Sequence, residues 1–217
     1  MTAVFLDLDG TLMHSQSGII SSLTHAFQST GLGHHAESDL TWMIGPPFVD
    51  SFAKIGITDP DPILAAYRKH YTAEGMYNAT VYDGVLQAMR DMRADGRRLY
   101  LMTAKPHAYA TQITAHFGLA PLMVAEFGPE LDGTRNWKGD LLTYALDQTG
   151  ETASSSVMVG DRHHDMAAAA EVGMPSIAVR WGYGEASDWV GAALELDHAS
   201  ALPKAVHECV GPAQLLK

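Results

Sequence analysis

The sequence has one cysteine, few basic residues and no long apolar run. Cys209 cannot form an intrachain disulfide, and it stands apart from any metal-ligand pattern, so we assign it no role. The chain has 14 Lys and Arg against 25 Asp and Glu, and this net charge of -11 disfavours nucleic acid and anionic membranes as partners. No segment reaches the ~20 apolar residues of a membrane-spanning helix, and the first residues lack a secretory-signal pattern. We therefore expect a cytoplasmic protein that acts on a small molecule.

The 217 residues are 47% hydrophobic, which is enough for a substantial core. Segments that are apolar and end at Gly, Pro or a polar turn predict strands buried on both faces, at residues 4–8, 99–103, 123–127, 156–160 and 176–181. Helical patterns fall between them, at residues 85–94, 107–116, 138–148 and 163–171. This alternation predicts an α/β fold with a Rossmann-like parallel sheet, closed by a helical tail from residue 191.

A long interval after the first predicted strand shows helical patterns and no convincing strand. The helical stretches are residues 18–29, 47–55 and 62–74. We therefore interpret residues 15–79 as an inserted α-helical cap. Residues 1–14 and 80–217 would then form the α/β catalytic core.

Two acids follow the first apolar strand at a spacing of two. Residues two apart on a strand point the same way, so Asp7 and Asp9 can enter one space at the carboxyl edge of the sheet. That edge is where open α/β sheets bind ligands. Gly10 permits the sharp turn that follows. A second Asp-Gly-Thr, at residues 132–134, has polar flanks and predicts only a turn.

Thr103 and Ala104 follow the second predicted strand and precede a helix. A hydroxyl and a backbone N–H at a helix start suit a phosphate, although such a threonine alone is more typical of a helix cap. A phosphoryl group also needs a neutralising cation, for which Lys105 and Lys138 are the candidates. We favour Lys138, which opens a later helix, even though a lone lysine there is usually a surface charge.

Asp161 and Asp165 follow the fourth predicted strand. They can converge with Asp7 around a hard cation, and Mg²⁺ favours a few carboxylates together with water and phosphate oxygens. The adjacent His163 and His164 suggest zinc instead. Neighbours on a helix point in different directions, however, and three or four convergent soft ligands are not evident.

Four segments in order resemble the motifs of the haloacid dehalogenase superfamily. Asp7-Leu8-Asp9-Gly10-Thr11 resembles the first motif, and the other three are residues 102–106, 136–140 and 157–165. The sequence departs from the family pattern at Ala104, where relatives usually carry a polar residue, and after Lys138, where many carry proline. Within the superfamily the chain looks like the phosphoglycolate phosphatase branch, which has a helical cap.

The resemblance implies an enzyme, a Mg²⁺-dependent phosphatase that works through an aspartyl-phosphate. Asp7 would be the nucleophile. Asp9 would protonate the leaving alkoxide and then activate water, and its backbone carbonyl would join Asp7 and Asp161 on the metal. The remaining roles follow the same resemblance: phosphate binding for Thr103, Ala104 and Lys138, and a place at or beside the metal for Asp165.

The cap is expected to select the substrate. Residues 43–48 resemble the substrate-facing loop of the phosphoglycolate phosphatase branch, although a helix that merely begins with proline explains them equally well. The loop residues expected at the substrate are Gly45, Pro46, Pro47 and Phe48. Arg68 or Lys69 would suit a substrate that carries a carboxylate.

The substrate class stays open between several phosphorylated metabolites. The resemblance favours phosphoglycolate, with 5'-nucleotidase and sugar-phosphate phosphatase or mutase activities as alternatives. Asp9 and Asp161 argue against a dehalogenase, which lacks the acid at the position of Asp9 and needs no metal. A receiver-like signalling module is also phosphorylated on aspartate, but there the acceptor normally follows the third strand. The sequence predicts no particular oligomeric state.

Overall fold

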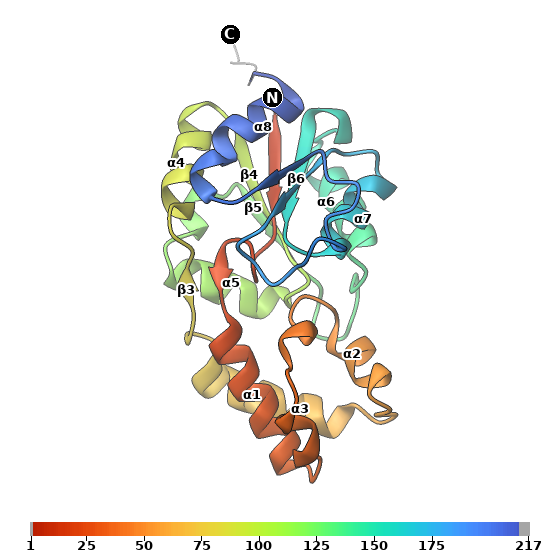
Figure 1. Ribbon diagram of the computed structural model, residues 1–217. Helices are drawn as coiled ribbons and strands as arrows, with labels where there is room; N and C mark the ends of the chain where they lie inside the picture. Colours follow the sequence, from red (N-terminus) through yellow and green to blue (C-terminus); the bar gives the residue numbers. More distant parts are fainter. Residues whose placement is uncertain (1, 213–217) are drawn as a thin grey trace.

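The computed structural model describes residues 2–212 and contains a six-stranded parallel sheet (Figure 1). The strand order is β5-β4-β1-β6-β7-β8, and every pairing in this sheet is parallel. The strands are β1 (Ala3–Leu6), β4 (Arg98–Met102), β5 (Ala125–Phe127), β6 (Ser156–Gly160), β7 (Ser176–Val179) and β8 (Leu194–Leu196). This arrangement confirms the predicted α/β Rossmann-like fold.

Helices cover both faces of the sheet. The helices α4 (Val85–Ala94), α5 (His107–His116) and α8 (Leu202–Val210) contribute to the core on one face, and α6 (Lys138–Thr149) and α7 (His163–Glu171) to the core on the other. In β1, Val4 and Leu6 enter the first core while Ala3 and Phe5 enter the second. Burial on both faces explains why these strands are continuously apolar instead of alternating.

The central position of β1 determines where its following residues lie. β1 pairs with β4 on one side and β6 on the other, with Leu6 beside Leu101 and Val159. All three strands run in the same direction, so their carboxyl ends meet at one edge. Residues directly after β1, β4 and β6 therefore gather there, at the position where open α/β sheets bind ligands.

The helical segment, residues 15–79, begins and ends next to a short antiparallel pair, β2 (Met13–His14) with β3 (Thr80–Val81). Its main helices are α1 (Gln16–Ser29), α2 (Phe48–Lys54) and α3 (Asp61–His70), and α3 continues into a π-helix, Tyr71–Gly75. Short 3-10 turns, Gly33–Glu37 and Thr41–Met43, complete it. The segment lies beyond the carboxyl ends of the strands (Figure 1).

Several predicted boundaries differ from the structure. The predicted strands at 4–8 and 176–181 end at Leu6 and Val179, although the N–H groups of Asp7 and Arg180 each make one further bond to the neighbouring strand. The predicted helical tail from residue 191 is wrong in part, since β8 precedes α8; its three residues pair only with β7 and give no apolar run. The missed β2 and β3 are two residues long each, which is too short for a periodic pattern.

None of the helices in the described part of the chain combines the length and apolarity needed to cross a membrane.

Candidate active site

The loop after β1 brings two acids to the sheet edge. The Asp7 N–H still donates to Val159 O in the manner of the sheet, at 3.0 Å, and the chain then turns through Gly10, whose φ is +86°. A Cβ atom on Gly10 would lie 2.3 Å from Asp161 Oδ2. The glycine is therefore needed both for the turn and for the close approach of Asp161.

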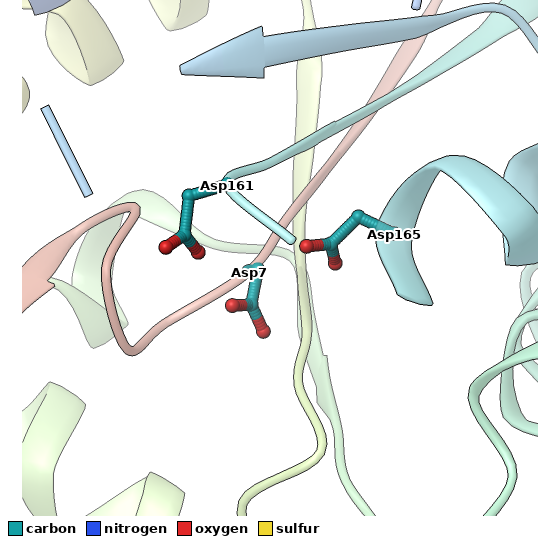
Figure 2. Close-up of side chains that lie close together, drawn as sticks. All are labelled: Asp7, Asp161 and Asp165. Carbon is teal, nitrogen blue, oxygen red and sulfur yellow. The ribbon is translucent and has the colours of Figure 1, made fainter. Parts of the chain in front are cut away.

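Asp7, Asp161 and Asp165 form a buried acidic cluster (Figure 2). One oxygen from each carboxylate lies within 4.8 Å of those of the other two. Burial, together with repulsion from Asp165, raises the pKa of Asp7 to about 7, even though Lys138 opposes the shift. Burial and the two other carboxylates likewise raise the pKa of Asp161 well above its usual value. Nearby positive charge would therefore stabilise the ionised form of these carboxylates.

Lys138 supplies part of that charge. Its ammonium lies 2.8 Å from Asp7 Oδ1 and 2.5 Å from Asp165 Oδ1. Burial alone would lower the pKa of Lys138, but the two carboxylates outweigh burial and raise it. One ammonium does not balance three buried carboxylates. A set of hard oxygen donors with excess negative charge fits a cation such as Mg²⁺.

The loop after β7 holds Asp161 in place. The backbone N–H groups of Tyr183 and Gly184 donate to Asp161 Oδ2 at 2.7 and 3.3 Å, and Trp189 Nε1 donates to its carbonyl oxygen at 3.0 Å. Sequence reasoning missed this loop. The available signal was the Gly-Tyr-Gly at 182–184, which follows the buried strand β7 after two residues, because glycine there permits close backbone approach.

Asp9 has its own partners, separate from the acidic cluster. Ser15 Oγ donates to Asp9 Oδ1 at 2.6 Å, and Lys105 Nζ lies 2.9 Å from Asp9 Oδ2. Lys105 Nζ also donates to Tyr71 Oη in the helical segment, at 3.0 Å. The two candidate lysines thus divide between the two acids after β1: Lys138 contacts Asp7, and Lys105 contacts Asp9.

The predicted phosphate-binding residues line the same cavity as the acids. Thr103 is buried, and its hydroxyl accepts a hydrogen bond from the Lys105 N–H at 3.2 Å. Ala104 follows it on the cavity wall, and Asp7, Asp9 and Lys138 lie there as well. Side chains from the loops after β1 and β4, and from α6 and α7, therefore face one space.

The helical segment closes the other side of a cavity of about 380 Å³. The predicted loop residues Gly45, Pro46, Pro47 and Phe48 all line it, and so does Arg68. Arg162, directly after Asp161, donates from Nη1 to Ile44 O at 3.2 Å, which joins this loop to the core. Lys69 is exposed and is not among the described residues that line the cavity.

The two histidines of the fourth segment lie side by side. Their ring centroids are 3.7 Å apart, so the expectation that His163 and His164 diverge is wrong. His163 Nδ1 lies 3.0 Å from Asp188 Oδ1, whereas His164 faces the cavity, where burial and repulsion from His163 and Lys138 lower its pKa to about 4. Over residues 2–212, the group with metal-ligand spacing contains carboxylates and no histidine.

The second Asp-Gly-Thr forms a turn, as predicted. The Thr134 N–H donates to Asp132 Oδ1 at 2.9 Å. Asp132 and Gly133 nevertheless reach the outer rim of the cavity, and Asp132 adds negative charge there.

The chain is similar in sequence and fold to known hydrolases and to other proteins. The model of the haloacid dehalogenase-like hydrolases matches residues 4–179. The chain is 38% identical over 185 residues to the tyrosine-protein kinase PtkA of Mycobacterium tuberculosis, covering 84% of this chain but 63% of that protein. It is 34% identical over 184 residues to a 5'-nucleotidase of Pseudomonas aeruginosa, covering 83% of both. Among solved structures, a predicted phosphatase from Clostridium acetobutylicum matches with a TM-score of 0.90 and 31% identity, over 95% of this chain and 98% of that one.

Proposed function

The chain belongs to the haloacid dehalogenase-like hydrolases, and we propose that it is a Mg²⁺-dependent phosphatase that hydrolyses a small phosphomonoester through an aspartyl-phosphate. The observation that carries this proposal is the position of Asp7. It lies in a cavity at the carboxyl edge of the sheet, with Lys138 and two further carboxylates around it. Residues 15–79 would act as the cap over residues 1–14 and 80–217.

The first half-reaction uses Asp7 as the nucleophile. An Asp7 oxygen attacks phosphorus, the bond from phosphorus to the ester oxygen breaks, and Asp9 gives a proton to the departing oxygen. The Lys138 ammonium and the N–H groups that follow Thr103 would hold the phosphoryl oxygens and screen their charge. Asp9 can reach the leaving group because Ser15 and Lys105 hold its two oxygens.

The second half-reaction removes the phosphoryl group from Asp7. Asp9 takes a proton from a water molecule as the water oxygen attacks phosphorus, and the acyl-phosphate bond breaks to restore the Asp7 carboxylate. The helical segment would exclude bulk water while the ester is present, and its loop contact with Arg162 supports that closure.

The residues suited to Mg²⁺ are Asp7, the carbonyl of Asp9, Asp161 and Asp165. When bound, the ion would neutralise charge that develops on the phosphoryl oxygens. The fit rests on the hard oxygen donors and on the excess negative charge, which Lys138 balances only in part.

A second candidate is phosphoryl transfer to or from protein tyrosine, which the name of PtkA suggests. The 38% identity to that protein favours it, while the 34% identity to a 5'-nucleotidase favours hydrolysis of a small ester. Phosphoglycolate phosphatase and sugar-phosphate mutase activities use the same core chemistry. A receiver-like module is disfavoured, because Asp7 follows the first strand of the sheet.

The test is a release assay for inorganic phosphate on a panel of phosphomonoesters, with Mg²⁺ and with EDTA. Wild type should turn over with Mg²⁺ and stop with EDTA, and Asp7→Asn should be inactive while keeping the wild-type Tm. Exposed Asp147→Asn is the matched control. Retained turnover in Asp7→Asn would remove Asp7 as the nucleophile, and phosphate transfer from ATP to a tyrosine peptide without ester hydrolysis would favour the kinase reading.

A further inference from the structure

The cavity is larger than the phosphoryl site alone requires. Its volume of about 380 Å³ falls in the range of about 300 to 1,000 Å³ that is typical of sites for drug-sized ligands. It extends from Asp7 at the sheet edge to Leu64 and Asp61 on α3. A two-carbon ester would leave much of this space filled with water, so the shape and chemistry of the outer wall bear on what the substrate carries.

Aromatic rings form one wall of the cavity, here called the aromatic wall: Phe48, Tyr67, Tyr71 and Tyr109. The Tyr67 and Tyr71 rings are nearly parallel, with centroids 5.2 Å apart and planes 12° apart. Phe48 meets Tyr67 edge-on at 4.7 Å, and Tyr109 meets Tyr71 edge-on at 6.0 Å. The rings hold each other at fixed angles, so they offer a preformed apolar surface.

The aromatic wall begins at the leaving-group position. Tyr71 Oη lies 3.0 Å from Lys105 Nζ, and that ammonium lies 2.9 Å from Asp9. Asp9 is the group proposed to protonate the leaving oxygen. Whatever the ester oxygen carries therefore meets Tyr71 first, and then Tyr67 and Phe48 further out.

The charges on the cavity wall disfavour a second anionic group on the substrate. Three of the cations that line the cavity, Lys105, Lys138 and Arg162, already lie near carboxylates. The fourth, Arg68, donates from Nη2 to Leu131 O at 3.3 Å. The acids Asp61 and Asp132 also line the cavity and add negative charge to its wall.

We propose that the physiological substrate carries an aromatic ring close to its phosphate, and that the aromatic wall recognises this ring. The proposal rests on the proposed phosphatase function. A nucleoside 5'-monophosphate and a benzyl-type or phenolic phosphate share this chemistry. Both place a flat, mostly uncharged ring beyond the ester oxygen, where it can lie against Phe48 or Tyr109, the partly exposed rings of the wall.

Two matched substrate pairs isolate the contribution of the ring. Benzyl phosphate and ethyl phosphate are both esters of primary alcohols, so they differ mainly in the ring. AMP and ribose 5-phosphate differ in the base. With Mg²⁺ present, we expect kcat/KM to be at least about tenfold higher for the ring-bearing member of at least one pair, since a ring contact adds to burial of apolar area. The pair with the larger ratio identifies which kind of ring, a nucleobase or a benzyl-type ring, the cavity prefers.

Variants link that preference to the aromatic wall. Phe48→Leu and Tyr109→Leu keep apolar bulk but remove a ring, and each should lower the ratio within the preferred pair severalfold, mainly through a higher KM for the ring-bearing member. Tyr109→Phe keeps the ring, so it should keep the wild-type ratio. The matched control is Tyr77→Leu, because Tyr77 is 44% exposed and stacks on His116 outside the cavity.

Each outcome has one meaning. Hydrolysis of all four esters with ratios near one would overturn the aromatic inference and leave the phosphatase proposal standing. No Mg²⁺-dependent hydrolysis of any ester would overturn the phosphatase proposal itself. A tenfold preference that survives both leucine variants would show that another part of the cavity recognises the ring. The Tm of each variant is measured beside its kinetics, and either leucine variant alone provides the test if the other fails to fold.

Discussion

The ammonium of Lys105 lies between the carboxylate of Asp9, at 2.9 Å, and the hydroxyl of Tyr71, at 3.0 Å. Tyr71 belongs to the π-helix of the helical segment, and Asp9 follows the central strand of the sheet. One lysine after β4 therefore joins the proposed acid–base residue to the proposed cap. This contact gives Lys105 a part in positioning Asp9 that differs from the part of Lys138 at Asp7.

Replacing Lys105 should impair turnover more than binding. In Lys105→Met, Asp9 loses a partner that holds Oδ2, and small errors in the position of a catalytic group can cost about 10²-fold in rate. We expect kcat to fall by about tenfold to a hundredfold, with KM changed by less than threefold. Steady-state kinetics on the best substrate measure both constants.

Two further variants show whether a loss in Lys105→Met comes from its contacts with Asp9 and Tyr71. Lys69→Met removes an exposed lysine of α3 and should match wild type. Tyr71→Phe removes only the hydroxyl that accepts from Lys105, and it should give a smaller loss of kcat than Lys105→Met. An unchanged kcat in Lys105→Met would show that Ser15 alone positions Asp9.

Mg²⁺ should stabilise the folded protein, because the three carboxylates of the acidic cluster repel one another in its absence. A ligand at about 100 times its Kd adds about 2.7 kcal/mol to the free energy of unfolding. For a chain of this size each kcal/mol shifts Tm by about 2–4 °C, so we expect a rise of about 5–10 °C.

Removing one carboxylate of the acidic cluster should reduce this effect. Asp161→Asn should raise the Tm of the metal-free protein and shrink the Mg²⁺ shift severalfold, while Asp147→Asn, an exposed acid of α6, should behave as wild type. Thermal melts with Mg²⁺ and with EDTA provide the measurement. The same Mg²⁺ shift in wild type and in Asp161→Asn would place the ion elsewhere.

The site was predictable where its residues lie directly after buried strands. Asp7, Thr103 and Asp161 follow β1, β4 and β6, and parallel neighbours bring them together once the sheet is predicted. Three contacts could not be found this way. The Lys105–Tyr71 hydrogen bond and the Arg162–Ile44 hydrogen bond join the core to the helical segment across long sequence separations. The support of Asp161 by Tyr183 uses a backbone N–H group, for which the flanking Gly182 and Gly184 are an indirect sequence signal.

Asp188 should stabilise the loop after β7 at neutral pH and lose that effect in acid. Its carboxylate accepts from the N–H groups of His163 and Glu185, at 3.2 and 3.0 Å, and lies 3.6 Å from Arg162 Nε. Burial opposes the charged form, but these donors outweigh burial and lower the pKa of Asp188 below its usual value. A lowered folded-state pKa contributes stability above the unfolded value, which is lost as the pH falls through the folded one.

Asp188→Asn should therefore cost about 1–3 kcal/mol at pH 7, and this difference from wild type should shrink below about pH 4. Urea unfolding of both proteins from pH 7 to pH 3 measures the difference. Other carboxylates titrate in the same window, but they are common to both proteins and cancel in the comparison. A difference that stays constant down to pH 3 would mean that the charge of Asp188 contributes nothing.

Gly184 provides a test of the loop that holds Asp161. A Cβ atom on this residue would lie 1.7 Å from the carbonyl oxygen of Asp161, so Gly184→Ala must displace either the loop or Asp161. Gly33→Ala is the matched control, since its added Cβ would meet no atom closer than 3.9 Å and Gly33 does not have a positive φ. We expect Gly184→Ala to raise the half-saturating Mg²⁺ concentration by about tenfold or more, because supporting contacts of metal ligands typically contribute 10- to 100-fold in affinity. Gly33→Ala should leave this concentration unchanged.

A Mg²⁺ titration of phosphatase activity, with Tm recorded for both variants, measures the effect. Equal half-saturating Mg²⁺ concentrations in the two variants would show that Asp161 keeps its position without this close backbone contact.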